Sequence, residues 1–279
     1  MKSLFGDLHV HSCFSDGNYL PIQLIEKAVS KGLDFISITD HDTVDGVIEA
    51  KKRDTYRSFR LIEGIELTVS FNPKIHILGY NINIEDIFLN DYLRLNKLMS
   101  IRDFMKFIKL LRKKYEINEF EKYSKIIPFS FSNLIKSLVI DGVISDEHDY
   151  YIREISGVNY NGAISEYYPS LTNGVNVIRN SGGIPVLAHP GQLSYKNNDL
   201  LELVTYLKKI GLRGIECYHP SHTKLQCESY LKIAKEYDLF ITGGSDYHDD
   251  IDVSIDYGMF YNDSILDFEK EAMRLKVIY

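Results

Sequence analysis

The sequence predicts an α/β protein, a seven-stranded β/α barrel with an all-helical insertion. Short apolar runs bounded by turn residues alternate with amphipathic helical segments, as in proteins built from repeated β/α units. This alternation covers residues 1–85 and 166–279, and a strand-poor stretch at 86–165 interrupts it. Polar side chains capable of binding metal end, follow or lie within every predicted strand. A closed barrel is favoured, because all its strands end around one mouth, whereas an open sheet concentrates ligands at one switch point.

The first barrel segment contains four predicted strands and two predicted helices. The first helix begins near Pro21, where proline is tolerated, and stops at Gly32. Its apolar face is expected to carry Ile22, Ile25, Ala28 and Val29. The second helix is expected at Val44–Arg53. The strands are expected at Leu4–Val10, Asp34–Thr39, Arg60–Ile65 and Ile75–Tyr80.

The insertion and the second barrel segment complete the chain. Residues 92–115 have apolar side chains at helical spacing mixed with Lys and Arg, which is typical of a long amphipathic helix. Shorter helices are expected at 134–140 and 148–155. After residue 166 the strands are expected at Ile184–Ala188, Gly214–Cys217 and Leu239–Thr242, and the helices at Leu171–Ser181, Leu200–Ile210 and Lys224–Tyr237. We expect the seven strands to form a parallel sheet.

Charge and composition exclude some classes of partner. The net charge of −7 argues against binding to duplex nucleic acid, which depends on a basic surface. A small anionic substrate remains compatible, because bound cations would reverse the field locally. No apolar run is long enough to predict a membrane helix. The three cysteines form no CxxC pair and favour the reducing cytoplasm. We expect a monomer.

Histidines and carboxylates at the strand ends are the candidate metal ligands. His9 and His11 lie two residues apart on a strand, so their rings point to the same side. Taken singly, each candidate has an ordinary explanation: Asp16 could be a turn residue and His76 a core histidine. His, Asp or Glu residues occur at all seven strand ends, with Glu216, His219 and His222 at the sixth. This indicates metal binding, because borderline divalent metals take imidazole and carboxylate ligands. The nine candidates are His9, His11, Asp16, His41, Glu66, His76, His189, Asp246 and His248.

The chain resembles the polymerase-and-histidinol-phosphatase (PHP) family in the order and spacing of seven motifs. The motifs are Asp-Leu-His-Val-His-Ser at 7–12, Ser-Asp-Gly at 15–17, Ile-Thr-Asp-His-Asp at 38–42, Gly-Ile-Glu at 64–66, His-Ile-Leu-Gly-Tyr at 76–80, Ala-His-Pro at 188–190 and Ser-Asp-Tyr-His at 245–248. The resemblance implies a distorted seven-stranded, TIM-like barrel. It also implies a trinuclear zinc, manganese or iron site that hydrolyses phosphoesters with a metal-bound hydroxide.

The same resemblance implies how the ligands are shared among three divalent ions. One ion would be bound by His9, His11, Glu66 and Asp246. Glu66 would bridge to a second ion, which His76 and His189 would also bind. The third would be bound by Asp16, His41 and His248.

A nucleotide substrate is implied by the insertion and by Gly-Ile-Glu-Cys-Tyr-His-Pro-Ser-His at 214–222. Both resemble the PHP branch that removes phosphate from nucleotides, including nucleoside 3′,5′-bisphosphates and short RNA from its 5′ end. His222 matches that branch's substrate-side histidine, and His219 or His222 could bind phosphate or protonate the leaving alkoxide. The catalytic candidates are therefore Glu66, His219 and His222. Where the branch usually has an Arg and a His, this chain has Phe131 and Asn133. These two are further candidates for substrate contact.

Three alternative functions remain open. One is a histidinol-phosphate phosphatase or another sugar or metabolite phosphatase, although that branch is not marked by a long helical insertion. Another is an amidohydrolase barrel, which typically has a carboxylated lysine where Glu66 lies here. The last is a non-catalytic barrel, which would be expected to lose ligands, whereas all nine positions hold His, Asp or Glu.

Overall fold

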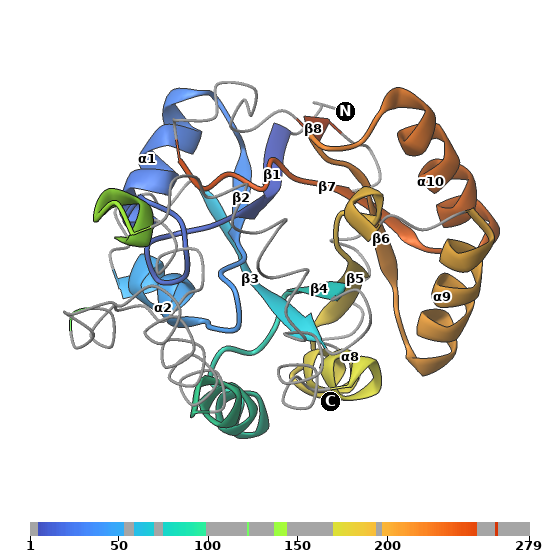
Figure 1. The fold of residues 1–279 in the computed structure, drawn as a ribbon, viewed down its shortest axis with the longest axis horizontal. Coiled ribbons are helices and arrows are strands. Elements are labelled where there is room, and N and C mark those ends of the chain that lie inside the picture. The colour runs from blue at the N-terminus through green and yellow to red at the C-terminus, as the bar shows by residue number, and fades with distance from the viewer. Residues whose placement is uncertain are drawn as a thin grey trace. The chain divides into compact units, whose positions relative to one another are not determined.

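The computed structural model describes residues 5–52, 59–69, 75–98, 122, 137–143, 170–193, 197–249 and 260–261 (Figure 1). The chain divides into two compact units, Met1–Tyr92 with Pro169–Tyr279, and Leu93–Tyr168. Residues 87–98 and 137–140 are helical, but most of the predicted insertion lies outside the described residues. Its all-helical character and the boundaries at 85 and 166 stay predictions. Among the described residues, no helix is long and apolar enough to cross a membrane.

The first unit contains a sheet whose first seven strands curl into a nearly closed barrel. The sheet has eight strands in the order β7-β6-β5-β4-β3-β2-β1-β8. Closure joins the ends of β1 and β7, because Val10 bridges to Tyr247. The amide of His11 also donates to the carbonyl of Tyr247 at 2.9 Å. The strands are β1 Phe5–Val10, β2 Phe35–Ile38, β3 Arg60–Val69, β4 Ile75–Tyr80, β5 Ile184–Leu187, β6 Gly214–Tyr218, β7 Phe240–Gly243 and β8 Phe260–Tyr261.

The prediction of an all-parallel sheet is wrong at β4. The pairs β1–β2, β2–β3, β5–β6 and β6–β7 are parallel, but β4 is antiparallel to both β3 and β5. The reason is the length of the connection. A parallel crossover needs a dozen or more residues, and only residues 70–74 separate β3 from β4. β8, which the sequence did not predict, adds an antiparallel edge beside β1.

Helices cover the outside of the barrel strands (Figure 1). On α1, Leu24, Ile25 and Ala28 are buried and pack in a cluster that includes Val10 of β1 and Ile38 of β2. Leu24 therefore faces the core, while Val29, expected on that face, is 39% exposed. The helices are α1 Pro21–Ser30, α2 Asp45–Lys52, α8 Leu171–Asn180, α9 Asn197–Ile210 and α10 Lys224–Glu236, with a 3-10 turn η2 at Pro190–Leu193.

Candidate active site

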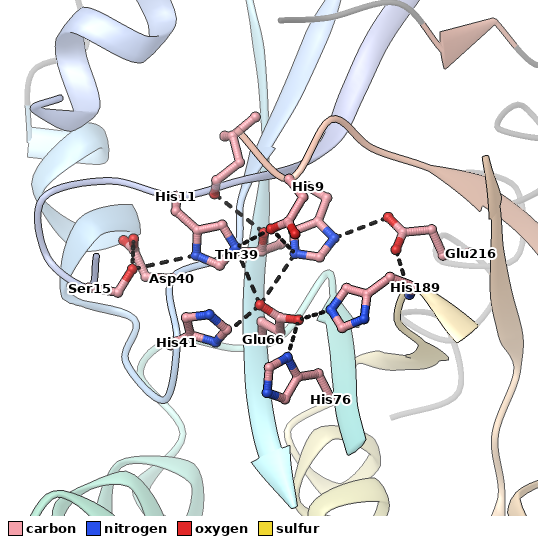
Figure 2. A network of polar contacts seen from close by, with 12 residues as sticks. His9, His11, Ser15, Thr39, Asp40, His41, Glu66, His76, His189 and Glu216 are labelled. Atoms are coloured by element: carbon pink, nitrogen blue, oxygen red, sulfur yellow. Dashed lines mark hydrogen bonds and ion pairs between the residues drawn. The ribbon is translucent and has the colours of Figure 1, made fainter. Parts of the chain in front are cut away.

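Histidines and carboxylates from many strands meet at one mouth of the barrel (Figure 2). His9 lies on β1, Glu66 on β3, and His189 two residues after the end of β5. His76 lies near the amino end of β4, and it pairs with Thr68 near the carboxyl end of β3. Because β4 is reversed, its amino end lies at the mouth where the parallel strands end. The reversal that contradicts the parallel prediction thus places His76 with the other candidates.

Glu66 is the centre of this cluster and is fully buried. Its Oε1 lies 2.9 Å from both His76 Nδ1 and His189 Nε2. Its Oε2 lies 3.1 Å from His41 Nδ1 and 3.3 Å from the Nε2 atoms of His9 and His11. Burial alone would raise the pKa of the Glu66 carboxyl, but the surrounding histidines hold it well below its usual range. One carboxylate therefore contacts five imidazole rings, with a different set on each oxygen (Figure 2).

Three overlapping groups of side chains could each hold a metal ion. The ligand atoms of each group lie within 4.8 Å of one another, and His11, His41 and Glu66 each belong to two groups. His41 lies between the groups, with Nδ1 on Glu66 and Nε2 3.8 Å from Asp16 Oδ2. The groups are His9, His11, Glu66 and Asp246; His41, Glu66 and His76; and His11, Asp16, His41 and His248. His189 belongs to none of these groups but contacts Glu66. All nine predicted ligands therefore lie together.

The hydrogen-bonding state of these atoms fits metal ions. Within the described ranges, several of the facing ring nitrogens and carboxylate oxygens are buried without a hydrogen-bond partner. Buried polar atoms are costly unless something satisfies them, and a shared cation does so for nitrogen and oxygen ligands alike. The atoms are His9 Nε2, His11 Nε2, Asp16 Oδ1, His41 Nδ1, Glu66 Oε2 and His76 Nδ1. Imidazole with carboxylate is a donor set that suits zinc, manganese or iron.

Proton affinities in the site are strongly perturbed. Burial disfavours the charged ring of His11, but Asp246 and Glu66 outweigh it and raise the pKa of His11 to about 10. Burial lowers the pKa of His41 to about 4, and Glu66 and Asp16 offset this only in part. The histidines hold the pKa of Asp246 well below its usual range against the effect of burial. Without metal, the site therefore retains both ionised carboxylates and protonated imidazoles.

Two buried carboxylates behind the ligands have contacts that sequence reasoning missed. Asp40 accepts hydrogen bonds from the amide and hydroxyl of Ser12, both at 2.7 Å, and from the Ser15 hydroxyl at 2.8 Å. These bonds fix the loop that carries Asp16. Glu216 contacts His9 and the main chain of His189. An acid inside the apolar strand Ile-Glu-Cys was the available signal for Glu216.

The predicted substrate residues have different environments. His219 Nε2 lies 3.3 Å from Asp246 Oδ2, and its Nδ1 lies 2.8 Å from the Ser221 hydroxyl. His222 bonds to the main chain at both nitrogens: Nδ1 lies 3.1 Å from the Cys217 carbonyl, and Nε2 accepts from the Gly191 amide at 3.2 Å. His219 thus contacts a candidate metal ligand, whereas both ring nitrogens of His222 bond to main-chain groups. Phe131 and Asn133 lie outside the described residues.

The barrel and its histidine–carboxylate centre define a metal-dependent hydrolase. The chain belongs to the PHP family, because the PHP domain model matches residues 7–240. With relatives named for cleavage of phosphate esters, the protein is a metal-dependent hydrolase that acts on phosphoester bonds.

Similar proteins differ in their named substrates. The chain is 29% identical to a phosphoribosyl 1,2-cyclic phosphate 1,2-diphosphodiesterase of Eggerthella lenta, over 87% of this chain and 93% of that protein. It is 27% identical to a 5′-3′ exoribonuclease of Haemophilus influenzae, over 87% and 89%. It is also 27% identical to a 3′,5′-nucleoside bisphosphate phosphatase of Chromobacterium violaceum, over 87% and 86%.

A solved structure supports the fold. An amidohydrolase from Chromobacterium violaceum superposes with a TM-score of 0.84 and 23% identity, covering 96% of each chain. At this identity the likeness shows the fold alone.

Proposed function

We propose that the protein hydrolyses a small phosphomonoester, a nucleotide or nucleoside 3′,5′-bisphosphate, with short oligoribonucleotides as further substrates. The observation that carries this proposal is Glu66, a buried carboxylate whose two oxygens contact five imidazoles at the barrel mouth. We propose three divalent ions there, zinc, manganese or iron, bound by the nine candidate ligands. When bound, such ions lower the pKa of a coordinated water and balance charge on phosphoryl oxygens.

The protein's own residues supply orientation and a proton. Glu66 and Asp246 give the site negative charges that would hold the cations. Hydrolysis breaks the bond between phosphorus and the ester oxygen, and the leaving alkoxide needs a proton. His219 lies beside Asp246 and is the residue proposed to deliver that proton or to hold the phosphate. His222 would need to release its bonds to Cys217 and Gly191 first, so its substrate role stays a prediction.

A ribose cyclic phosphodiester is the second candidate substrate. The diphosphodiesterase of Eggerthella lenta is named for such a substrate, and the identity to it is 29%. A phosphoribosyl cyclic phosphate and a nucleoside 3′,5′-bisphosphate share one chemistry, a ribose that carries two phosphate groups. The Arg and His usual in the nucleotide branch are replaced by Phe131 and Asn133, which fits a change of substrate within this chemistry.

Hydrolysis of a matched substrate panel tests the proposal, measured as free phosphate, ring-opened phosphomonoester or released nucleotide according to the substrate. The panel contains a nucleoside 3′,5′-bisphosphate, its 5′-monophosphate, histidinol phosphate, a phosphoribosyl 1,2-cyclic phosphate and a 5′-phosphorylated short RNA. The protein is assayed with zinc, manganese or iron(II) and with a chelator. We expect metal-dependent turnover of the nucleoside 3′,5′-bisphosphate, the phosphoribosyl 1,2-cyclic phosphate or both, and we expect this turnover to be lost on chelation. Preference for histidinol phosphate, or turnover unaffected by chelation, would contradict the proposal. The monomeric state and a cytoplasmic location stay predictions.

A further inference from the structure

Glu216 of β6 is fully buried and lies directly behind two candidate metal ligands. Its Oε1 lies 3.0 Å from His9 Nδ1, and its Oε2 accepts a hydrogen bond from the main-chain amide of His189 at 2.7 Å (Figure 2). Both of these donors belong to candidate metal ligands. Neither bond requires Glu216 to face the substrate.

The bond to His9 fixes the tautomer of that ring. A carboxylate only accepts hydrogen bonds, so His9 donates its Nδ1–H to Glu216. In the neutral ring that binds metal, the other nitrogen, Nε2, then keeps its lone pair. It points toward the metal centre, 3.3 Å from Glu66 Oε2 and 3.4 Å from Asp246 Oδ1. A carboxylate behind a metal-binding histidine sets the tautomer and ring orientation in this way.

The bond to His189 supports a strained backbone. His189 has a φ of 22°, a region that non-glycine residues rarely adopt. The hydrogen bond from the His189 amide to Glu216 holds the chain in this conformation at the end of β5. The side chain then places Nε2 2.9 Å from Glu66 Oε1. Glu216 therefore supports a ligand on each of the two oxygens of Glu66.

We propose that Glu216 is a positioning residue that holds His9 and His189 as a pair and thereby couples two of the metal positions. This inference rests on the proposed metal function. The group of His11, Asp16, His41 and His248 has a second support that does not involve Glu216, because Asp40 bonds to the loop after β1 that carries Asp16. Loss of Glu216 should therefore weaken two metal positions and leave the third intact.

Zinc titration of a Glu216→Gln variant tests the coupling. Glutamine keeps the shape of the side chain, but its terminal group has one acceptor oxygen and one donor nitrogen. It therefore cannot accept hydrogen bonds from His9 and His189 on two separate oxygens, as Glu216 does. We expect the affinity of two zinc ions to fall roughly 10–100-fold, the size typical for loss of a carboxylate behind a metal ligand. Asp16→Asn should weaken the third ion instead. Glu63→Gln is the matched control, because Glu63 lies on β3 and pairs with Lys51 at the surface.

Nuclear magnetic resonance of the wild-type protein gives a reading that does not depend on the variant's folding. In the zinc-loaded protein, His9 should show a protected Nδ1–H and a zinc-bound Nε2. Zinc on Nδ1 of His9, or unchanged affinities in Glu216→Gln, would overturn the positioning role while leaving the metal function intact. A wild-type protein that binds no zinc, manganese or iron would overturn the proposed function, and this inference with it.

Discussion

Among the single residues of the site, Glu66 contacts five imidazoles and belongs to two groups of candidate ligands. Asp16 also lies near three histidines, but it belongs to only one group of candidate ligands. A shared ligand holds two positions, so its loss affects both. The distinction between these two carboxylates is directly testable.

Replacing Glu66 by glutamine should lower metal content and turnover more than replacing Asp16 by asparagine. The change removes one negative charge from between five imidazoles. Metal ions contribute several kcal/mol to charge stabilisation in the transition state. We therefore expect turnover to fall on the order of 100-fold or more, since each ~1.4 kcal/mol is a factor of ten. Elemental analysis and steady-state kinetics measure both effects. Near wild-type metal content in Glu66→Gln would show that Glu66 is not a shared ligand.

His219→Asn should slow hydrolysis in a manner that depends on the leaving group. A general acid typically contributes roughly 100- to 10,000-fold when the leaving alkoxide needs a proton. A 4-nitrophenolate leaving group needs none, so 4-nitrophenyl phosphate should lose much less rate than a nucleotide. His222→Asn is the comparison, because both ring nitrogens of His222 bond to main-chain groups. An equal loss on both substrates in His219→Asn would argue for phosphate binding instead.

The sequence predicted which side chains gather at the mouth of the barrel, but it did not predict the hydrogen bonds that support them from behind. Alternation along a strand is local, and it places His9 and His11 on one side from the sequence alone. The bond between His9 and Glu216 joins residues 207 positions apart. Such a contact depends on the register between distant strands, which no local pattern encodes. The same limit hid the main-chain bonds of His222.

At the level of elements, β4 shows what strand patterns do and do not determine. Its bounds, Ile75–Tyr80, match the prediction, because an apolar run flanked by turns marks a strand whatever its direction. Direction depends on the connection to the neighbouring strand, and the short segment 70–74 permits only a hairpin. β3 extends to Val69, four residues beyond the expected end, so Glu66 lies within the strand. The two errors share one cause, since the long β3 leaves little chain before β4.

The approach of β7 to β1 depends on a glycine. A Cβ on Gly244 would come within 2.1 Å of His9 Cβ and 2.7 Å of the His9 amide nitrogen. Gly244→Ala should therefore separate the two strand ends and destabilise the metal-free protein by about 1–3 kcal/mol. It should also reduce zinc affinity, because Asp246 follows two residues later. Calorimetric unfolding and zinc titration measure these effects, with the exposed Val29→Ala as control. Unchanged stability would show that the strand ends can separate without cost.

For the whole molecule, metal binding should release protons and become tighter as pH rises. Metal binds the neutral imidazole, but the pKa of His11 is raised to about 10 in the metal-free site. Each displaced proton should weaken affinity about tenfold for every unit that pH falls below that value. In the metal-free protein, the stability contributed by His11 is fully present below its unfolded pKa and is lost as pH rises through about 10. Zinc should therefore stabilise the fold more as pH rises, whereas protonation of His11 stabilises the metal-free fold as pH falls from about 10 toward neutrality.

Calorimetric titration with zinc in buffers of different ionisation enthalpy counts the released protons. The increase in Tm on adding zinc should be larger at pH 8 than at pH 6. A zinc affinity independent of pH over this range would show that the histidines are already neutral.

The seam between β1 and β7 determines when the site can form. The amide of Ser245 donates to Asp7 across 238 positions of the chain, whereas β3 and β4 pair as neighbours along it. Contacts between distant segments carry the larger loop-closure entropy and form late in folding. His9 and His11 are synthesised long before Asp246 and His248, so a growing chain first holds only part of the ligand set. Metal binding should therefore require synthesis of β7 and the residues that follow it, and a bound ion should slow opening at the seam. Hydrogen exchange should be faster at the amides of His11 and Asp246 than in the β3–β4 hairpin, and zinc should remove much of that difference.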